Sequence, residues 1–337
     1  MPATPSNDIC VIQLDNPPVN ALSWPLRKAI LEQIALANAD SFVRAIVIAG
    51  SDRVFSAGAD ISEFDTDLGT RWPDLRDVIA AIEQSEKPVV AAITGTCLGG
   101  GLELALGCHA RVAHPDARIG LPESTLGLLP GAGGTQRLPR AIAPERAVRM
   151  IMSGKIEPAR SFEGTGLFQA IGPDAPGTAT ILARALASGR AEVRLLRHEP
   201  VDPEALARSL SALDKSRMRD SHLGIVEALN ALGKLPFDEA LKLEADIFTR
   251  LESSPEAKAL RYAFFAERQA GRMQDPRPEP RPIATVGVVG SGTMGRGIAI
   301  ATLKAGYSVT LSDTSDAALR AAKELIDTSL ARDVSKG

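Results

Sequence analysis

Two glutamates and two glycine-bearing turns in this sequence could together form a catalytic site. Three consecutive glycines, 99–101, follow an apolar run and precede the helical pattern LELALG. Without side chains there, a ligand can approach the backbone, and the unpaired amides at a helix N-terminus attract negative charge. Glu103 lies in the first turn of that helix, and Glu123 follows in the segment GLPEST. Such a turn could hold an oxyanion through its backbone amides, with the carboxylate of Glu103 close by.

A second turn could supply another backbone donor to the same site. The segment FSAGADI, residues 55–61, follows four residues after the apolar run AIVIAG, residues 45–50. Two amides that converge on one oxygen would stabilise a thioester carbonyl whose oxygen gains charge as an enolate forms. Taken singly, each glycine is explained by close helix–strand packing and each glutamate by a solvated surface position. Spacing alone does not decide between these two interpretations.

A third glycine pattern, Gly290-x-Gly292-x-x-Gly295, lies near the end of the chain. It follows a predicted strand at 285–290 and opens a predicted helix that reaches about Ala305. A second predicted strand, 307–313, ends at an aspartate, where an acid can bind a ribose 2'-hydroxyl and so favours NAD over NADP. The predicted cofactor-binding residues are Gly290, Gly292, Thr293, Met294, Gly295 and Asp313.

The elements that must position these groups alternate between strand and helix in the first half of the chain. Apolar runs at 9–15, 42–50 and 88–95 predict strands, and helices are expected from Ser23 and over 75–82. This alternation predicts an α/β fold with a largely parallel sheet under helical cover. Beyond about residue 141 the pattern becomes helical, with segments expected at 177–188, 203–213, 217–232 and 237–271.

The segment DPRPEPRP, residues 275–282, has four prolines and should be extended and stiff. We place a domain boundary there. The expected division is a first domain at 1–190, a helical extension at 191–274, this proline-rich linker, and a nucleotide-binding part at 283–337.

Composition narrows the class of protein. Of the 337 residues 45% are hydrophobic and 23% charged, with a net charge of −3, so we expect no nucleic-acid partner. No apolar run approaches the ~18 residues of a membrane span, and the N-terminus lacks a signal-peptide pattern, so a cytoplasmic location is expected. No His, Cys or carboxylate cluster has metal-ligand spacing, and no serine or cysteine lies in a nucleophile elbow, so neither a metal nor a hydrolase triad is expected.

With these motifs in place, the sequence closely resembles the crotonase (enoyl-CoA hydratase/isomerase) superfamily, specifically the N-terminal part of the multifunctional fatty-acid β-oxidation enzymes. From residue 281 the resemblance continues into the start of the 3-hydroxyacyl-CoA dehydrogenase part of those enzymes. The segments that carry the first resemblance are NPPVNALS (16–23), FSAGADI (55–61), LGGGLELALGCHARVA (98–113), IGLPESTLGLLPGAGGTQRLPR (119–140) and SSPEAKALRYAFFAERQ (253–269).

The resemblance implies a fold and an organisation. The fold would be a crotonase-like spiral of β-β-α units with a helical C-terminal region, followed by an incomplete Rossmann βαβ half-domain. The chain would then be a fragment of a bifunctional enzyme that ends early in the dehydrogenase domain. NAD would be a cofactor only of a complete dehydrogenase domain, so we expect weak or no NAD binding here.

The resemblance also implies an activity and its residues. Oxyanion donors would be the amides of Ala57 and Gly100, and the catalytic carboxylates Glu103 and Glu123. Glu103 would deprotonate a water, and Glu123 would exchange the proton at the α-carbon of an enoyl-CoA, without a cofactor. Such proton exchange also permits isomerisation of 3-enoyl-CoA to 2-enoyl-CoA. The implied binding residues for the acyl-CoA are Ala57, Gly58, Ala59, Asp60, Ile61 and Gly100.

Two other classes of function stay open at this point. The glycine pattern near residue 290 allows an NAD-dependent 3-hydroxyacyl-CoA dehydrogenase, and the whole chain could be a non-catalytic CoA-binding module. Glutamate at both positions, 103 and 123, favours hydration over these two other classes of function. Acyl-chain length, the balance between hydratase and isomerase, and the oligomeric state are not predicted from the sequence.

Overall fold

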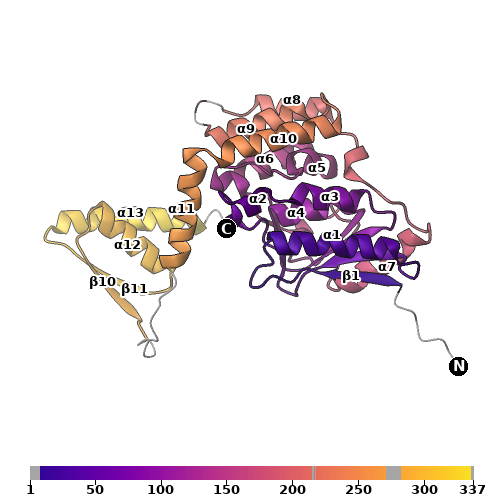
Figure 1. Ribbon diagram of the computed structural model, residues 1–337. Coiled ribbons are helices and arrows are strands. Elements are labelled where there is room, and N and C mark those ends of the chain that lie inside the picture. The colour runs from indigo at the N-terminus through magenta and orange to yellow at the C-terminus, as the bar shows by residue number, and fades with distance from the viewer. Residues whose placement is uncertain (1–7, 215, 217, 271–281, 335–337) are drawn as a thin grey trace. The chain divides into compact units, whose positions relative to one another are not determined.

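The computed structural model describes residues 8–214, 216, 218–270 and 282–334 (Figure 1). The chain divides into two compact units, Met1–Gly271 and Arg272–Gly337. Of the predicted linker at 275–282, all but Pro282 lies outside the described residues. The finer boundaries expected at residues 190 and 274 stay predictions.

The first unit is built on a parallel five-stranded sheet with the order β1-β2-β4-β6-β9. Its central strands β2, β4 and β6 are buried on both faces, as parallel sheets under helical cover require, whereas the edge strands β1 and β9 are partly exposed. The strands are β1 (Ile9–Gln13), β2 (Ala45–Ala49), β4 (Val89–Ile93), β6 (Ala110–Ala113) and β9 (Ala170–Ile171).

Alternate residues of the strands in this sheet pack into two different hydrophobic clusters, one on each face of the sheet. Ala45 and Val47 of β2 pack with α7 (Ala175–Ala187), whereas Ile46 and Ile48 join the main core. On the main-core side, α1 (Trp24–Ala39), α3 (Leu75–Glu83) and α4 (Gly100–Gly107) pack in succession (Figure 1). The sheet thereby holds a helical layer on each face.

A second sheet runs in the order β3-β5-β7-β8 and was not predicted. Three-residue strands are too short to show a periodic pattern in the sequence. Because β2 leads to β3, β4 to β5 and β6 to β7, each turn of the chain adds one strand to each sheet. This is the expected spiral of β-β-α units, and the predicted fold class is confirmed. The strands are β3 (Val54–Ser56), β5 (Thr96–Leu98), β7 (Arg118–Gly120) and β8 (Glu157–Pro158).

Short helices complete this part of the unit. Within the described residues they are η1 (Ile61–Glu63), α2 (Asp67–Thr70), η2 (Pro122–Leu126), α5 (Gly134–Ala141), α6 (Pro144–Ser153), η3 (Ala159–Phe162) and η4 (Leu196–His198).

The helical region that follows folds back over its own chain. It comprises α8 (Pro203–Ser211), α9 (Asp220–Ala231), α10 (Phe237–Glu252) and α11 (Pro255–Ala270). α9 and α10 pack on α5, and α11 contacts η2. The single helix expected at 237–271 is wrong, because the Oγ of Ser254 accepts a hydrogen bond from Ala257 N at 3.1 Å and Pro255 starts a new helix.

The second unit is a βαβ unit followed by a helix. Its elements are β10 (Thr285–Val289), α12 (Thr293–Lys304), β11 (Ser308–Ser312) and α13 (Asp316–Val334). β10 and β11 are parallel, as the Rossmann-type prediction requires. Among the described helices of both units, none is long and apolar enough to cross a membrane.

Candidate active site

Three turns of the first unit meet because they leave neighbouring strands of the second sheet. β3 leads into residues 57–61, β5 into α4, and β7 into η2. The strands are parallel, with Ser56 beside Cys97 after an irregularity in β3, and with Leu98 beside Gly120. Carboxyl ends of adjacent parallel strands lie at one edge of a sheet, so segments distant in sequence come together there.

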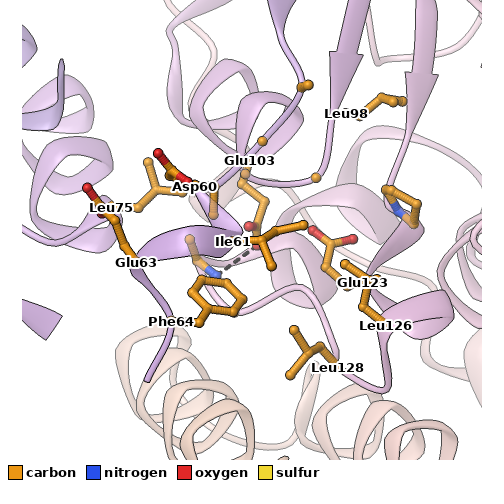
Figure 2. Close-up of a pocket in the computed structure, with 18 of the residues that line it drawn as sticks. Asp60, Ile61, Glu63, Phe64, Leu75, Leu98, Glu103, Glu123, Leu126 and Leu128 are labelled. Atoms are coloured by element: carbon orange, nitrogen blue, oxygen red, sulfur yellow. Dashed lines mark hydrogen bonds between the residues drawn. The ribbon is translucent and has the colours of Figure 1, made fainter. Parts of the chain in front are cut away.

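At this edge lies a cavity of about 490 Å³ into which Glu103 and Glu123 point (Figure 2). All six residues predicted to bind the substrate line it. One of them, Asp60, also caps η1 by accepting a hydrogen bond from Ser62 N at 3.0 Å. The six are Ala57, Gly58, Ala59, Asp60, Ile61 and Gly100.

Two backbone amides are free to bind a ligand in this cavity. Gly58 and Gly99 both have positive φ, at 110° and 52°, which favours glycine at these turns. A Cβ built on Gly100 would lie 3.1 Å from Ala59 N, so the two backbones are in contact. Gly100 is the first residue of α4, where an N–H has no partner within the helix. Within the described residues, no hydrogen bond involves the N–H of Ala59 or of Gly100.

The structure contradicts the prediction that Ala57 supplies an oxyanion donor. The N–H of Ala57 donates to the carbonyl of Val19 at 3.0 Å and is therefore occupied. Gly58 turns the chain after Ala57, so the next alanine of the motif, Ala59, presents its amide beside Gly100. Of the two alanine amides in this turn, the one left without a partner among the described residues is that of Ala59 and not that of Ala57.

Glu103 is held by the loop that precedes α5. Its Oε1 accepts hydrogen bonds from Ala132 N and Gly134 N, both at 2.8 Å, and the residue is 3% exposed. Burial raises the pKa of Glu103, while the two amide donors and the nearby Arg137 act in the opposite direction. Glu103 thus has partners that stabilise its ionised form.

Glu123 has the opposite surroundings. Its Oε2 is buried without a hydrogen-bond partner among the described residues. Burial, followed by the negative charge of Glu103, raises the pKa of Glu123 well above its usual range. Of this coupled pair, Glu123 is therefore the group that binds a proton more readily. The two neighbouring carboxyl groups (Figure 2) can offer one ligand a base and an acid together.

Sequence reasoning missed the contribution of the helical region to the cavity. Phe248 of α10 and Phe264 and Arg268 of α11 line it. Phe248 meets Phe64 edge-to-face, with ring centroids 6.0 Å apart. No motif marks Phe248. Phe264 and Arg268 lie in the segment 253–269 that carries part of the resemblance, but their place in the cavity depends on how the helices fold back.

In the second unit, the glycine turn has the form that a dinucleotide requires. Gly290 has a φ of 99°, and a Cβ on Gly292 would meet no atom within 4 Å, which leaves room for a pyrophosphate. A Cβ on Gly295 would lie 1.8 Å from the carbonyl oxygen of Gly290, so close packing there excludes any side chain. A tight turn, room for the pyrophosphate and close packing of helix on strand are the three roles of the glycines in a nucleotide-binding fingerprint.

Asp313 follows β11, and its side chain contacts the glycine turn. It accepts hydrogen bonds from Ser291 N at 2.6 Å and from Ser291 Oγ at 2.7 Å. The bond from the Ser291 amide is the main reason that the pKa of Asp313 is lowered to about 2. Thr293 and Met294 form the first turn of α12. The residues of this turn fit NAD, which would supply a hydride acceptor when bound.

Among the described residues, no group of three or more His, Cys, Asp or Glu could hold a metal ion.

The two sheets and their spiral connection define a protein of the crotonase fold. A solved enoyl-CoA hydratase/isomerase from Pseudoalteromonas atlantica T6c shares this fold, with a TM-score of 0.59 and 24% sequence identity over 77% of this chain and 94% of that chain. The family model described as Enoyl-CoA hydratase/isomerase matches residues 4–210. The chain belongs to this family. A second family model, 3-hydroxyacyl-CoA dehydrogenase, NAD binding domain, matches residues 285–337.

Curated relatives match the chain along nearly its full length. The peroxisomal bifunctional enzyme of Homo sapiens is 40% identical over 343 residues, which cover 98% of this chain and 47% of that protein. A peroxisomal fatty acid beta-oxidation multifunctional protein of Arabidopsis thaliana is 36% identical, with 98% and 49% covered. The chain therefore spans about half the length of these relatives. They confirm the predicted resemblance to the N-terminal part of multifunctional β-oxidation enzymes.

Proposed function

We propose that the first unit hydrates trans-2-enoyl-CoA thioesters to 3-hydroxyacyl-CoA, as a step of fatty-acid β-oxidation. The observation that carries this proposal is the buried pair of Glu103 and Glu123 beside the free amides of Ala59 and Gly100. The family match and the names of the relatives support the same substrate class. The reaction uses only groups of the protein and needs no cofactor.

In the proposed mechanism, the amides of Ala59 and Gly100 donate to the thioester oxygen. Glu103 takes a proton from a water molecule while the oxygen of that water bonds to the β-carbon, and negative charge moves onto the thioester oxygen. Glu123 then gives its proton to the α-carbon, and the carbonyl is restored. Water has added as OH and H, and one proton must pass from Glu103 back to Glu123 before the next turnover.

The same acid supports a second proposed activity. In its ionised form, Glu123 can remove a proton from the α-carbon of a 3-enoyl-CoA and return that proton at the γ-carbon, which gives the 2-enoyl-CoA. The oxyanion donors serve this step too, because an enolate is again formed. Isomerase activity should therefore accompany hydration at this cavity.

The second unit supports another candidate function, NAD-dependent oxidation of 3-hydroxyacyl-CoA. The glycine turn and the family match at 285–337 favour it. Its substrate would be the product of the proposed hydration, so both activities would serve one reaction sequence. The cytoplasmic location expected from the sequence stays a prediction, and the names of the relatives place those proteins in peroxisomes or glyoxysomes.

Loss of the absorbance of the conjugated enoyl thioester tests the proposal. Crotonyl-CoA and a longer 2-enoyl-CoA should both lose absorbance with the protein, equally with and without NAD. NAD reduction with 3-hydroxyacyl-CoA, in the absence of any hydration, would favour the dehydrogenase instead. Binding of acyl-CoA without either reaction would identify a non-catalytic module.

We expect Gly100→Ala to lower kcat/KM for hydration by about 10²-fold, at the level typical for loss of one oxyanion donor. The added Cβ would lie 3.1 Å from Ala59 N and 2.8 Å from Leu75 Cδ2, so it crowds the position that the thioester oxygen needs. Steady-state kinetics with crotonyl-CoA measures this. Gly172→Ala is the matched control, since its Cβ would meet no atom within 4 Å. Wild-type rates in a folded Gly100→Ala protein would contradict the assigned donors.

A further inference from the structure

Glu244 is a third buried carboxyl group near the cavity, and the mechanism above does not use it. It lies on α10 with 0% exposure. Its neighbours on the buried face of the helix are Ala240, Ile247 and Leu251. A carboxyl group in such surroundings is unfavourable unless specific donors satisfy it. No ion pair of Glu244 occurs within the described residues, so its partners must be found among neutral groups.

Those partners are all at the start of α5. Glu244 Oε1 accepts from Gly133 N at 2.5 Å, and Oε2 accepts from Thr135 N at 3.0 Å and from the hydroxyl of Thr135. Gly133 is the N-cap of α5, with a φ of 102°. Glu244 therefore fixes a turn that belongs to a different part of the chain, more than a hundred residues earlier.

The same turn holds Glu103. Of its four successive amides, those of Ala132 and Gly134 donate to Glu103, and those of Gly133 and Thr135 donate to Glu244. The amides therefore alternate between the two carboxyl groups along the turn, and both carboxyl groups hold the same four residues. A shift of the turn would move both donors of Glu103 at once.

We propose that Glu244 is a positioning residue for Glu103, through which the helical region sets the geometry of the active site. The proposal rests on the proposed hydratase function. Glu244 does not touch the substrate in this scheme. It holds the turn at 132–135 so that Ala132 N and Gly134 N fix the orientation of the Glu103 carboxylate.

A second contact joins this turn to the helical region. Gln136 Nε2 donates to Thr135 Oγ1 at 2.9 Å and to the carbonyl of Ala228 on α9 at 3.0 Å. Because Thr135 Oγ1 donates to Glu244 and accepts from Gln136, its position is determined by both α9 and α10. The turn is thus held by two helices outside the β-β-α spiral.

The test compares Glu244→Gln with Asp246→Asn, which makes the same change from acid to amide at an exposed position of the same helix. Glutamine retains one acceptor and places an NH₂ group against an amide donor, so the turn should shift. We expect kcat for crotonyl-CoA hydration to fall by ~10- to 10²-fold in Glu244→Gln with KM changed less than about twofold, since a displacement of ~1 Å can cost about 10² in rate. Asp246→Asn should match the wild type.

Thr135→Val is the second variant, because it removes the two contacts of the hydroxyl, with Glu244 and with Gln136, and keeps all four amide contacts. It should lower kcat by less than Glu244→Gln, again at constant KM. A Glu244→Gln protein that is folded and has the kcat of Asp246→Asn would overturn the proposal. So would a parallel loss of kcat and of affinity for acyl-CoA, which indicates general damage to the unit.

Amide hydrogen exchange over residues 132–135 separates this proposal from the proposed function. Exchange there should be faster in Glu244→Gln than in Asp246→Asn, whether or not the wild type hydrates crotonyl-CoA. An inactive wild type would refute the hydratase function alone. Unchanged exchange in Glu244→Gln would refute the positioning role, even in an active enzyme.

Discussion

Glu123→Gln is expected to abolish both proposed activities, with kcat for hydration reduced by ~10³- to 10⁴-fold, at the upper end for loss of a general acid or base. Glutamine keeps the size of the side chain but cannot give a proton to the α-carbon. Isomerisation should fall by a similar factor, because Glu123 also moves the proton between the α- and γ-carbons. Assays with a 2-enoyl-CoA and a 3-enoyl-CoA measure the two losses separately.

The pH dependence of stability supplies the control for this variant. The pKa of Glu123 is raised in the folded protein, so the folded state binds more protons than the unfolded state above the ordinary carboxyl pKa. Stability from this group is therefore full at acid pH and falls as pH rises towards its folded pKa. Glu123→Gln should unfold at a higher temperature than the wild type at pH 8 and show no such gain near pH 4. An inactive variant with lower stability at pH 8 would contradict this account of Glu123.

The longer elements of the fold were predictable from the sequence because their patterns extend far enough to be recognised. β2 and β4 are buried apolar runs, and α3 has apolar residues at helical spacing. β3, β5 and β7 have three residues each, and their pairing depends on contacts between segments distant in sequence. These short strands are nevertheless the elements that bring the three turns of the site together.

The candidate site was predictable as a set of residue types, and less so as geometry. Glu103 and Glu123 lie together as the resemblance implied. The choice between the amides of Ala57 and Ala59 depends on the φ of Gly58 and on the carbonyl of Val19, neither of which is written in a motif. A glycine in sequence allows a positive φ without requiring it.

Glu244 did carry a signal in the sequence that was not used. Residues 240, 244, 247 and 251 recur at the four- and three-residue spacing of a buried helix face, and three of them are apolar. A glutamate at such a position indicates a specific partner, because a buried carboxyl group without one is unfavourable. Which partner it has follows only from the packing of α10 on α5.

Glu103→Gln is expected to separate the two proposed activities. Hydration needs a base that takes the proton of water, so kcat for hydration should fall by ~10²- to 10³-fold. Isomerisation involves no water, and its proton stays with Glu123, so its rate should fall by less than about tenfold. The ratio of the two rates, measured on one preparation, reports this difference without depending on the fraction of active protein.

The same variant also tests the coupling between the two carboxyl groups. The negative charge of Glu103 helps to raise the pKa of Glu123, and glutamine removes that charge. The pH at which the remaining isomerase activity changes should therefore move to lower values in Glu103→Gln. Equal loss of both activities, with the pH profile unchanged, would mean that Glu103 and Glu123 do not divide the proton transfers as proposed.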